Sequence, residues 1–441
     1  MSEAHAVPET RILFRHIDDP DLRTIEGYRR RGGYGALERA LRHTEPEQLL
    51  NELEECGLRG RGGAGFSMGK KAGFLPRGEM QKYLCCNADE SEPGTFKDRE
   101  LMSKNPHQLI EGIVIAAIAA DATKTFIYIR GEYAETADLL DEAVAEAYDA
   151  GFLGENILGS GANVDLVVHR GAGAYICGEE TALLDSLEGK RGNPRLKPPF
   201  PAIQGLYGGP TLINNVETLM NVPHVVRNGA DWFKSFGTEQ STGTKVVSVS
   251  GRVKRPGNYE IELGIPAREL IFELAGGPLT GGVKAWYPGG SSAPVLGPEE
   301  LDLPYSFEAL ADAGSMLGSG AVIVADESVS IPQMALRTAR FYQHESCGKC
   351  TPCREGTNWT VKMLERVVAG QATPMDLDII ASVQENIIGH CLCVLGDAMA
   401  MPVASMVKRW RGEFEETIAR AREASPIAID AAPAIPIGVD A

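Results

Sequence analysis

The chain has 441 residues, of which 43% are hydrophobic and 23% charged, and its formal net charge is −17. This balance is typical of a globular protein of about two to four domains. The acidic excess argues against nucleic acid as a partner, because neutralising phosphates requires clustered lysine and arginine. No apolar run reaches the ~20 residues of a membrane-spanning helix, so we expect no direct membrane insertion.

The first half of the chain alternates between predicted helices and predicted strands. Residues 1–11 have the pattern of neither a secretory signal nor a transit peptide, which favours a cytoplasmic protein. Residues 1–55 are charged and helix-like, and residues 57–71 form a loop rich in glycine and arginine. The alternation that follows favours an α/β domain with a largely parallel sheet. We expect strands at 83–86, 125–130 and 164–169, and helices at 107–120, 132–150, 179–187 and 215–228.

The second half divides into two further regions and a tail. Short β-like runs at 245–251, 257–262 and 284–287, with a helix at 267–275, predict a small mixed module of roughly 80 residues. Residues 330–423 have helical periodicity and predict a bundle. We therefore expect four parts: an α/β domain over 1–240, a mixed module over 241–328, a helical bundle over 329–424 and a flexible tail over 425–441.

Three cysteines fall within seven residues of the bundle: Cys347, Cys350 and Cys353. Thiolates at this spacing can converge on one iron–sulfur cluster, and a bacterial ferredoxin run begins in the same way. That run adds its fourth cysteine after three more residues, where this chain has Thr357. The fourth ligand must therefore come from another part of the chain.

Two later cysteines, Cys391 and Cys393, are the downstream candidates for the fourth ligand. A structural zinc site is the main rival, although such sites usually pair two separated Cys-x2-Cys or Cys/His groups. His344 and His390 could complete a mixed site of that kind. The residues alone therefore favour an iron–sulfur cluster and leave zinc open.

A glycine motif lies in the loop that follows the N-terminal helices. Gly60, Gly62 and Gly65 match Gly-x-Gly-x-x-Gly, but the motif follows a helix-like segment, which disfavours an ordinary dinucleotide-binding Rossmann site. A P-loop is disfavoured because Lys70 is followed by Lys71 and not by serine or threonine. Backbone amides exposed by glycine beside cationic side chains suit a phosphate or a flat ring. A purely structural glycine turn is the alternative.

Two polar turns follow predicted strands. Residues 87–94 follow the strand at 83–86, at the end of a strand where open α/β sheets bind ligands. Residues 171–180 follow the strand at 164–169 as a glycine turn that opens a helix, whose N-terminus could face a phosphate. Tyr175 adds an aromatic face to that turn.

Taken together, six long segments resemble the flavin-bearing, NADH-oxidising subunit of respiratory complex I. Residues 245–326 also resemble the ubiquitin-like, soluble-ligand-binding β-grasp domain of that family. The resemblance implies FMN and one [4Fe–4S] cluster as cofactors and NADH as substrate. It implies a non-standard Rossmann-like α/β domain, then the β-grasp module, then a helical bundle that carries the cluster. The segments that carry it are 57–66, 86–94, 171–183, 193–201, 214–218 and 345–356.

The resemblance also assigns residues. It implies a direct hydride transfer from NADH to FMN without a catalytic side chain, and Glu92 and Glu180 would position NADH. The cluster ligands would be Cys347, Cys350, Cys353 and Cys393; Cys391 departs from the family pattern. The implied FMN- and NADH-binding residues are Gly60, Gly62, Gly63, Gly65, Phe66, Lys71, Phe74, Asn87, Asp89, Glu90, Ser91, Glu92, Tyr175, Gly178, Glu179, Glu180, Lys197, Phe200, Asn214, Asn215 and Thr218.

The expected function is that of an NADH dehydrogenase component that passes electrons singly from FMN to the cluster. The resemblance implies two partners, a thioredoxin-like [2Fe–2S] subunit and a multi-cluster iron–sulfur subunit, in a quinone-reducing complex on the cytoplasmic face of the inner membrane. One alternative is the diaphorase subunit of an NAD-linked hydrogenase or formate dehydrogenase. Another, of a different class, is a non-catalytic metal-binding scaffold.

Overall fold

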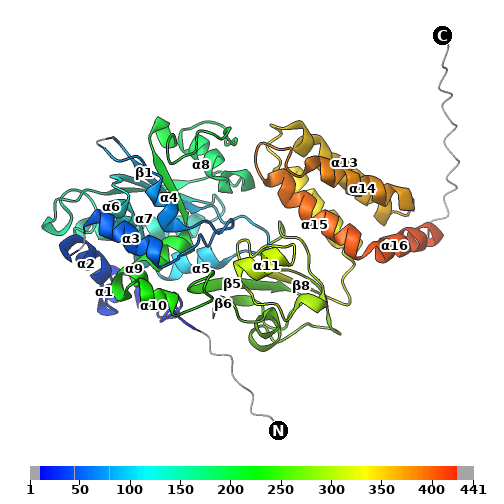
Figure 1. Ribbon diagram of the computed structural model, residues 1–441, viewed down its shortest axis with the longest axis horizontal. Helices are drawn as coiled ribbons and strands as arrows, with labels where there is room; N and C mark the ends of the chain where they lie inside the picture. Colours follow the sequence, from blue (N-terminus) through cyan, green and yellow to red (C-terminus); the bar gives the residue numbers. More distant parts are fainter. Residues whose placement is uncertain (1–9, 44, 79, 425–441) are drawn as a thin grey trace, which may run out of the picture.

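The computed structural model describes residues 10–43, 45–78 and 80–424, and the tail expected over 425–441 lies outside them. The N-terminal helices surround a first sheet, a second sheet lies beside them, and the C-terminal helices form the opposite end of the molecule (Figure 1). None of the helices in these ranges combines the length and the apolar character needed to span a bilayer.

The first sheet has four parallel strands in the order β3-β2-β1-β4. The strands are β1 (Tyr83–Ala88), β2 (Lys124–Ile129), β3 (Asp165–Arg170) and β4 (Thr211–Asn215). The parallel sheet and its first three strands are therefore confirmed. β4 was not predicted from the sequence, because its five residues lie between a proline- and glycine-rich stretch and a helix that begins directly after Asn215.

Ten helices of the described residues belong to this half of the molecule. Residues 57–71 were expected to form a loop throughout. This prediction is wrong at its end, because α4 begins at Met68. The helices are α1 (Ile25–Arg30), α2 (Gly35–His43), α3 (Pro46–Glu55), α4 (Met68–Gly73), α5 (Lys97–Lys104), α6 (Pro106–Ala119), α7 (Ala134–Asp149), α8 (Glu180–Leu187), α9 (Val216–Asn228) and α10 (Ala230–Lys234).

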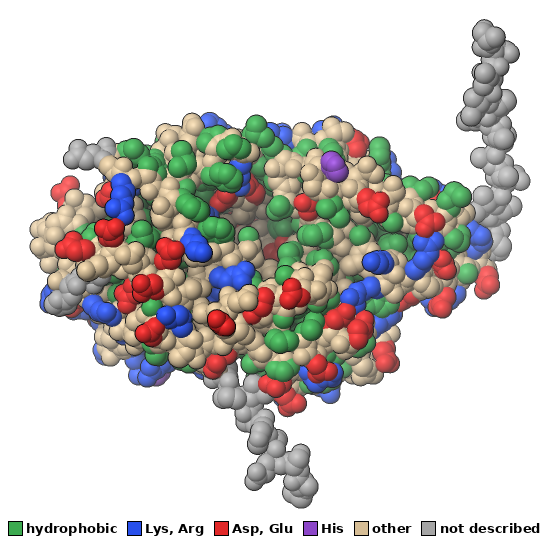
Figure 2. Space-filling model, in the orientation of Figure 1, with side chains coloured by type: hydrophobic (Ala, Val, Ile, Leu, Met, Phe, Trp, Pro, Cys, Tyr) green, Lys and Arg blue, Asp and Glu red, His purple; other side chains and the backbone are tan. Residues whose placement is uncertain are grey.

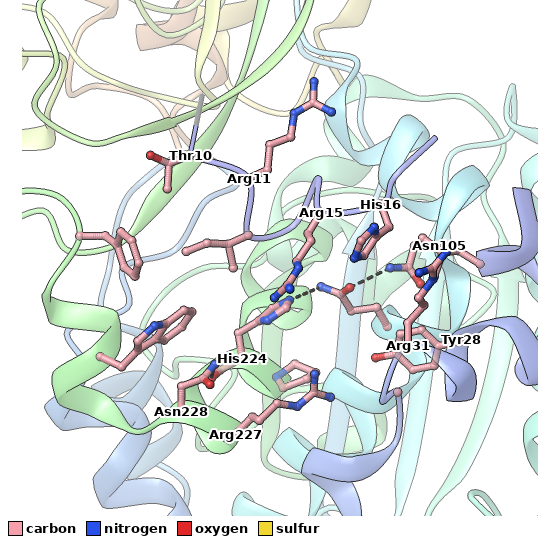
Figure 3. Close-up of a pocket in the computed structure, with 17 residues that line it drawn as sticks. Thr10, Arg11, Arg15, His16, Tyr28, Arg31, Asn105, His224, Arg227 and Asn228 are labelled. Atoms are coloured by element: carbon pink, nitrogen blue, oxygen red, sulfur yellow. Dashed lines mark hydrogen bonds between the residues drawn. The ribbon is translucent and has the colours of Figure 1, made fainter. Parts of the chain in front are cut away.

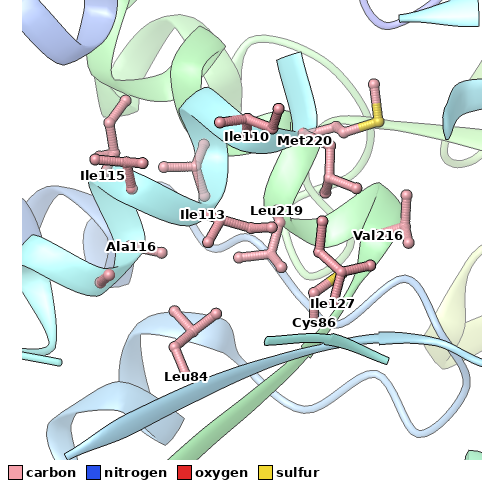
Figure 4. Packing of buried hydrophobic residues seen from close by; sticks show 14 of the residues in the cluster. Leu84, Cys86, Ile110, Ile113, Ile115, Ala116, Ile127, Val216, Leu219 and Met220 are labelled. Carbon is pink, nitrogen blue, oxygen red and sulfur yellow. The ribbon is translucent and has the colours of Figure 1, made fainter. Parts of the chain in front are cut away.

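Helices α6 and α9 pack closely over β1 in the core of this half (Figure 4). α6 is buried on nearly every side, which explains its continuous apolar sequence. A Cβ added to Gly112 would lie 2.1 Å from the carbonyl oxygen of Leu219, so only glycine permits this helix crossing. Burial of each large side chain here, such as Ile113 or Leu84, contributes about 1.5–3 kcal/mol. This core therefore holds both the start of α9 and the end of β1 in place.

The second sheet is mixed, with the order β6-β5-β8-β7. β5 pairs with β6 antiparallel and with β8 parallel, and β7 pairs with β8 antiparallel. This arrangement confirms the mixed module, although β8 was missed and the predicted helix at 267–275 is a π-helical turn over Glu269–Leu274. The elements are β5 (Thr244–Gly251), β6 (Gly257–Glu262), β7 (Val283–Tyr287), α11 (Phe307–Asp312) and β8 (Ala321–Asp326).

The C-terminal helices form the predicted bundle and share a core with the first sheet. Cys85, Tyr128 and Ile213 lie on the sheet and belong to a buried cluster that continues through α8 into these helices. The sheet and the cysteine-bearing region are therefore packed as neighbours. The helices are α12 (Ile331–Glu345), α13 (Thr351–Val368), α14 (Pro374–Ile387), α15 (Leu395–Arg409) and α16 (Arg411–Ala424).

Candidate functional site

The glycine loop lies between α3 and α4, so it follows a helix and not a strand, as expected. Fully buried Arg61 anchors the loop: its guanidinium donates to the carbonyl oxygens of Thr242 and Thr244 at 2.6 and 3.1 Å. The backbone N–H of Arg61 donates to Thr218 Oγ1 at 2.8 Å, which ties the loop to the first turn of α9. A Cβ on Gly62 would lie 2.7 Å from Cβ of Asn215. The loop is thus a rigid backbone surface pressed against the end of β4.

Two neighbouring strands present polar side chains beside this loop. β1 and β4 pair in parallel with Asn87 opposite Asn215, so their carboxyl ends meet at one edge of the sheet. Asn87 Nδ2 donates to the carbonyl oxygen of Gly178 at 2.8 Å, and Ser91 Oγ donates to that of Asp89 at 3.4 Å. The structure therefore brings four sequence segments together: 60–65, 87–92, 175–180 and 214–218.

Two buried side-chain atoms at this edge have no hydrogen-bond partner among the described residues: Asp89 Oδ2 and Asn214 Nδ2. Burial raises the pKa of Asp89 to about 7, although Arg130 opposes the shift. Buried polar atoms are rarely left unpaired in folded proteins, because each costs about 1–3 kcal/mol. One acceptor and one donor left open at the same edge of the sheet fit the edge of a flavin ring, which carries both N–H and carbonyl groups.

A cluster of lysine and glutamate flanks the same opening. Lys71 Nζ lies 2.8 Å from Glu180 Oε2, and Lys197 Nζ lies 2.8 Å from Glu180 Oε1 and 2.9 Å from Glu179 Oε1. Burial opposes the ionisation of Glu180, but Lys71 and Lys197 outweigh it and lower its pKa to about 2. Glu179 also caps α8, since its Oε2 accepts from the N–H groups of Thr181 and Ala182. These charges are thus held in fixed positions at a helix N-terminus.

Glu92 is held by two segments that are far from it in sequence. Its carboxylate accepts from Tyr175 Oη at 2.7 Å and from the N–H of Ser292 at 2.8 Å. A Cβ on Gly290 would lie 2.6 Å from Cγ of Glu92, so the backbone approaches closely there. Burial raises the pKa of Glu92, against these hydrogen bonds. Ser292 and Gly290 were not predicted from the sequence, where the run Gly289–Gly290–Ser291–Ser292 is the only signal of their position.

Aromatic side chains stand exposed near the opening. Phe66, Phe74 and Phe200 are each more than half exposed, which is uncommon for large apolar rings, and the rings of Phe66 and Phe74 lie 6.0 Å apart. Figure 2 shows the surface hollowed between the sheet-bearing half and the C-terminal helices, with hydrophobic and charged side chains around the recess. Such rings offer flat apolar faces for stacking.

Glu90 differs from the other residues expected in the site. Its carboxylate is buried and accepts from the N–H groups of Asp98 and Arg99 at 2.7 and 2.9 Å, so it caps the N-terminus of α5. Tyr133 Oη donates to the same carboxylate at 3.2 Å. The carboxylate oxygens of Glu90 therefore already accept hydrogen bonds from the protein, and these bonds connect the end of β1 to α5.

The five C-terminal cysteines gather at the start of α13 and just before α15. The N–H of Leu392 donates to Cys350 Sγ at 3.4 Å, and Cys391 interacts electrostatically with Cys353 and Cys350. Among residues 10–43, 45–78 and 80–424, no three potential ligands converge on a point that one metal ion would occupy. The cysteine run, the residues before α15 and the flavin-side turn are nevertheless close, because Cys393 interacts electrostatically with Cys347, Cys350 and Glu179.

Direct contacts join the cysteine region to the strand-end site. The N–H of Tyr175 donates to Glu345 Oε2 at 3.2 Å, two residues before Cys347. Lys349 Nζ donates to the carbonyl oxygen of Pro194 at 2.6 Å. The ring of Tyr175 also packs edge-on against Phe341 of α12, with centroids 5.1 Å apart. The two candidate cofactor sites are therefore adjacent in space, although their residues lie far apart in sequence.

Three regions of the chain match models of known protein families. The Nuo51 FMN-binding domain matches residues 53–224, the SLBB domain matches residues 246–296, and the NADH-ubiquinone oxidoreductase-F iron-sulfur binding region matches residues 333–417. The protein is therefore a flavoprotein of the NADH-oxidising class, with an FMN-binding domain and a 4Fe–4S region. This finding decides against the zinc alternative and the non-catalytic scaffold.

Individual relatives narrow the class to one family. The chain is 52% identical over 405 residues to the NADH-quinone oxidoreductase F 2 subunit of Rhizobium meliloti (strain 1021), covering 91% of this chain and 96% of that protein. It is 52% identical over 418 residues to the NADH-quinone oxidoreductase F subunit of Mycobacterium tuberculosis (strain ATCC 25618 / H37Rv), covering 93% and 94%. The chain belongs to the family of NADH-quinone oxidoreductase F subunits.

A solved structure shows the same fold. The crystal structure of NAD+-reducing [NiFe]-hydrogenase in the H2-reduced state matches with a TM-score of 0.80 and 38% identity over 87% of this chain. This chain spans 64% of the length of that hydrogenase chain. The fold expected from the sequence is thus confirmed by an experimental relative.

Proposed function

We propose that the recess at the carboxyl ends of β1 and β4 holds FMN, and that NADH binds over it between the exposed aromatic rings and the lysine–glutamate cluster. The observation that carries this proposal is the pair of buried, unpaired atoms, Asp89 Oδ2 and Asn214 Nδ2. FMN would supply there a hydride acceptor for NADH that can release electrons one at a time. The protein supplies position, exclusion of water and electrostatics.

The residues of the recess divide the work of binding. The glycine loop, Gly60, Gly62, Gly63 and Gly65, gives a bare backbone surface along which a flat ring can lie. Asn87, Ser91, Tyr175, Gly178, Asn215 and Thr218 border it. Lys71 and Lys197 supply positive charge for phosphates, with Glu179 and Glu180 fixing their ammonium groups. Phe66, Phe74 and Phe200 would stack on the adenine of NADH, and Glu92 would accept from a hydroxyl or amide of the nucleotide.

For the cluster we propose Cys347, Cys350, Cys353 and Cys393 as ligands. Cys393 interacts with Cys347 and Cys350, and Cys391 interacts with Cys353 and Cys350, so the choice of Cys393 rests on the family pattern. Thiolates are the ligands that iron–sulfur clusters require. Replacing Cys393 and Cys391 by serine, one at a time, separates the two candidates by the iron content of the protein.

We also propose domain boundaries and partner subunits. The chain divides into domains at 1–240, 241–328 and 329–424, followed by a tail at 425–441. Because the relatives are named as one subunit of a larger enzyme, this chain works with other subunits. We propose a thioredoxin-like [2Fe–2S] subunit and a multi-cluster subunit as its neighbours, in a quinone-reducing complex at the cytoplasmic face of the inner membrane. Co-purification of these subunits with the tagged chain from membranes is the test.

The FMN proposal can be tested by titrating FMN into the FMN-free protein and following quenching of flavin fluorescence. Asn214→Ala should weaken FMN about fivefold to tenfold, because it removes one hydrogen bond. The matched control is Asn386→Ala, whose exposed side chain donates to the carbonyl oxygen of Ser382 on α14. Equal FMN affinity in Asn214→Ala and wild type would contradict the proposed ring position.

The solved relative favours one second candidate, the NAD-reducing diaphorase of a hydrogenase. The same recess would serve both directions of hydride transfer, so the site does not separate them. The higher identity to the NADH-quinone oxidoreductase relatives, 52% against 38%, favours the main proposal. Purification of the tagged chain with hydrogenase subunits, and without quinone-reducing ones, would reverse this choice.

A further inference from the structure

A second cavity, of about 450 Å³, lies at the far end of α9 from the flavin side (Figure 3). This size falls within the range of ~300–1,000 Å³ found for small-molecule sites. Residues 10–16, the end of α1, the start of α6, the last turns of α9 and α10 line it. Thr218 lies on the first turn of α9 and Arg227 on the last, about 14 Å away along the helix. The cavity is therefore separate from the proposed NADH site.

The charge of this cavity is opposite to that of the chain. Four arginines line it, and none of the described residues that line it is acidic, although the chain has a net charge of −17. Arg31 is paired with Asp19 at 2.6 Å. Arg227 donates to the carbonyl oxygen of Gly32 at 2.8 Å and forms no ion pair with a described residue, and the same holds for Arg15. Arg227 interacts electrostatically with buried Glu111, but neither guanidinium lies within ion-pair distance of a carboxylate among the described residues.

The floor of the cavity is a chain of polar side chains. Asn105 Nδ2 donates to Gln108 Oε1 at 2.8 Å, and Gln108 Nε2 lies 2.9 Å from His224 Nε2 (Figure 3). Burial, with Arg227 and Arg15, lowers the pKa of His224 to about 3, so the imidazole is neutral and its Nε2 accepts from Gln108. Asn105 Oδ1 is buried and has no donor among the described residues. An acceptor is therefore left open beneath the cationic rim.

One wall of the cavity is aromatic. Trp232 and Phe236 are half-buried, and their ring centroids lie 5.2 Å apart in an edge-to-face arrangement. Such rings give a ligand ring a flat apolar surface. The cavity thus combines two cations that form no ion pair with the described residues, an open acceptor and an aromatic wall, which match the phosphate, the hydroxyl groups and the base of a nucleotide.

We propose that this cavity binds a phosphorylated ligand of nucleotide size, with its phosphate between Arg15 and Arg227. A hydroxyl of the ligand donates to Asn105 Oδ1, and its ring packs against Trp232. Because α9 connects the cavity to Thr218, an occupant contacts the same helix that borders the flavin recess.

The test is calorimetric titration of ADP into the full-length, FMN-loaded protein carrying Lys197→Gln, which weakens the NADH site. We expect one saturable site. Arg15→Gln and Arg227→Gln should each weaken ADP about tenfold or more, because each removes a charge-assisted hydrogen bond. The matched control is Arg30→Gln at the last residue of α1, whose side chain is paired with Asp21 outside the cavity. With Lys197 intact, NADH oxidation by the three arginine variants should match wild type, which separates this test from that of the proposed function.

Three outcomes would overturn the proposal. These are no saturable ADP binding, equal ADP affinity with and without either arginine substitution, or equal weakening by Arg30→Gln. Inorganic pyrophosphate is the second probe and should bind at least tenfold more weakly than ADP. Pyrophosphate as tight as ADP would overturn the assignment of a nucleotide-sized ligand.

Discussion

Two polar regions lie back to back at the end of the first sheet, and they differ in how well their buried groups are paired. Behind the recess, Lys97 Nζ lies 2.9 Å from Glu217 Oε2, and Lys245 Nζ lies 2.5 Å from the same oxygen. In front, Asp89 and Asn214 each have a buried atom with no hydrogen-bond partner among the residues that the structure describes. Asn215 joins the two regions, since its Nδ2 donates to Asp98 Oδ2 at 2.6 Å. The paired region completes itself within the protein, whereas the front region is complete only with a ligand.

The largest expected effect is the loss of the iron–sulfur cluster on substitution of a cysteine, because the cysteine region adjoins the front region and also needs a ligand to be complete. Cys393→Ser should abolish the [4Fe–4S] cluster, because serine replaces a required thiolate ligand. Cys391→Ser is the matched control, two residues away, and should keep the cluster. Iron content and the EPR signal of the reduced protein measure both. Loss of the cluster in Cys391→Ser with its retention in Cys393→Ser would exchange the two assignments.

The next largest expected effect is a loss of stability on breaking an ion pair of the paired region. Lys245→Met should lower the free energy of unfolding by about 3–5 kcal/mol, because it leaves Glu217 as a buried, less compensated charge. Urea unfolding of the cofactor-free protein measures this change.

The control for Lys245 is Lys234→Met, which removes an exposed pair with Asp231 and should leave the unfolding midpoint unchanged. If Lys245→Met is as stable as wild type, the region behind the recess does not hold it together. A restored stability in Lys245→Met combined with Glu217→Leu would show that the unpaired charge caused the loss.

A smaller effect is expected from one cation of the front region. Lys197→Gln should raise the KM for NADH about tenfold and leave kcat nearly unchanged, because the ammonium contributes binding and no chemical step. Lys190→Gln, which removes the exposed pair with Glu188 in the same stretch of chain, is the control. Steady-state NADH oxidation with an artificial acceptor provides the measurement. A fall in kcat without a change in KM would place Lys197 outside the nucleotide site.

The sequence predicted most of the front region and little of the region behind it. Asn87, Asn214 and the cysteine run lie in motifs whose spacing is local, so they could be read from neighbouring residues. Contacts such as Glu92 to Ser292, or Lys97 to Glu217, join residues more than 100 positions apart and have no local pattern. Glu90 shows the limit most clearly: it lies inside the predicted acidic turn, yet its carboxylate caps α5. Strands β4 and β8 were missed because pairing with neighbouring strands, and not alternation, defines them.

The most direct test of whether a flavin completes the front region is the affinity for FMN as a function of pH. In the FMN-free protein the pKa of Asp89 is raised to about 7, so this side chain is largely protonated at pH 5.5. A donor from the ring to Asp89 Oδ2 favours the charged form and lowers that pKa, so binding below pH 7 must release a proton. FMN affinity should therefore rise as the pH increases from 5.5 to 7 and level off above 7. The phosphate of FMN also titrates near this range, and Asp89→Asn separates the two groups.

We expect fluorescence titrations of the wild type to show this rise and Asp89→Asn to lose most of it. The same pH dependence in Asp89→Asn and wild type would contradict the claim that the flavin completes the unpaired groups at the end of β1.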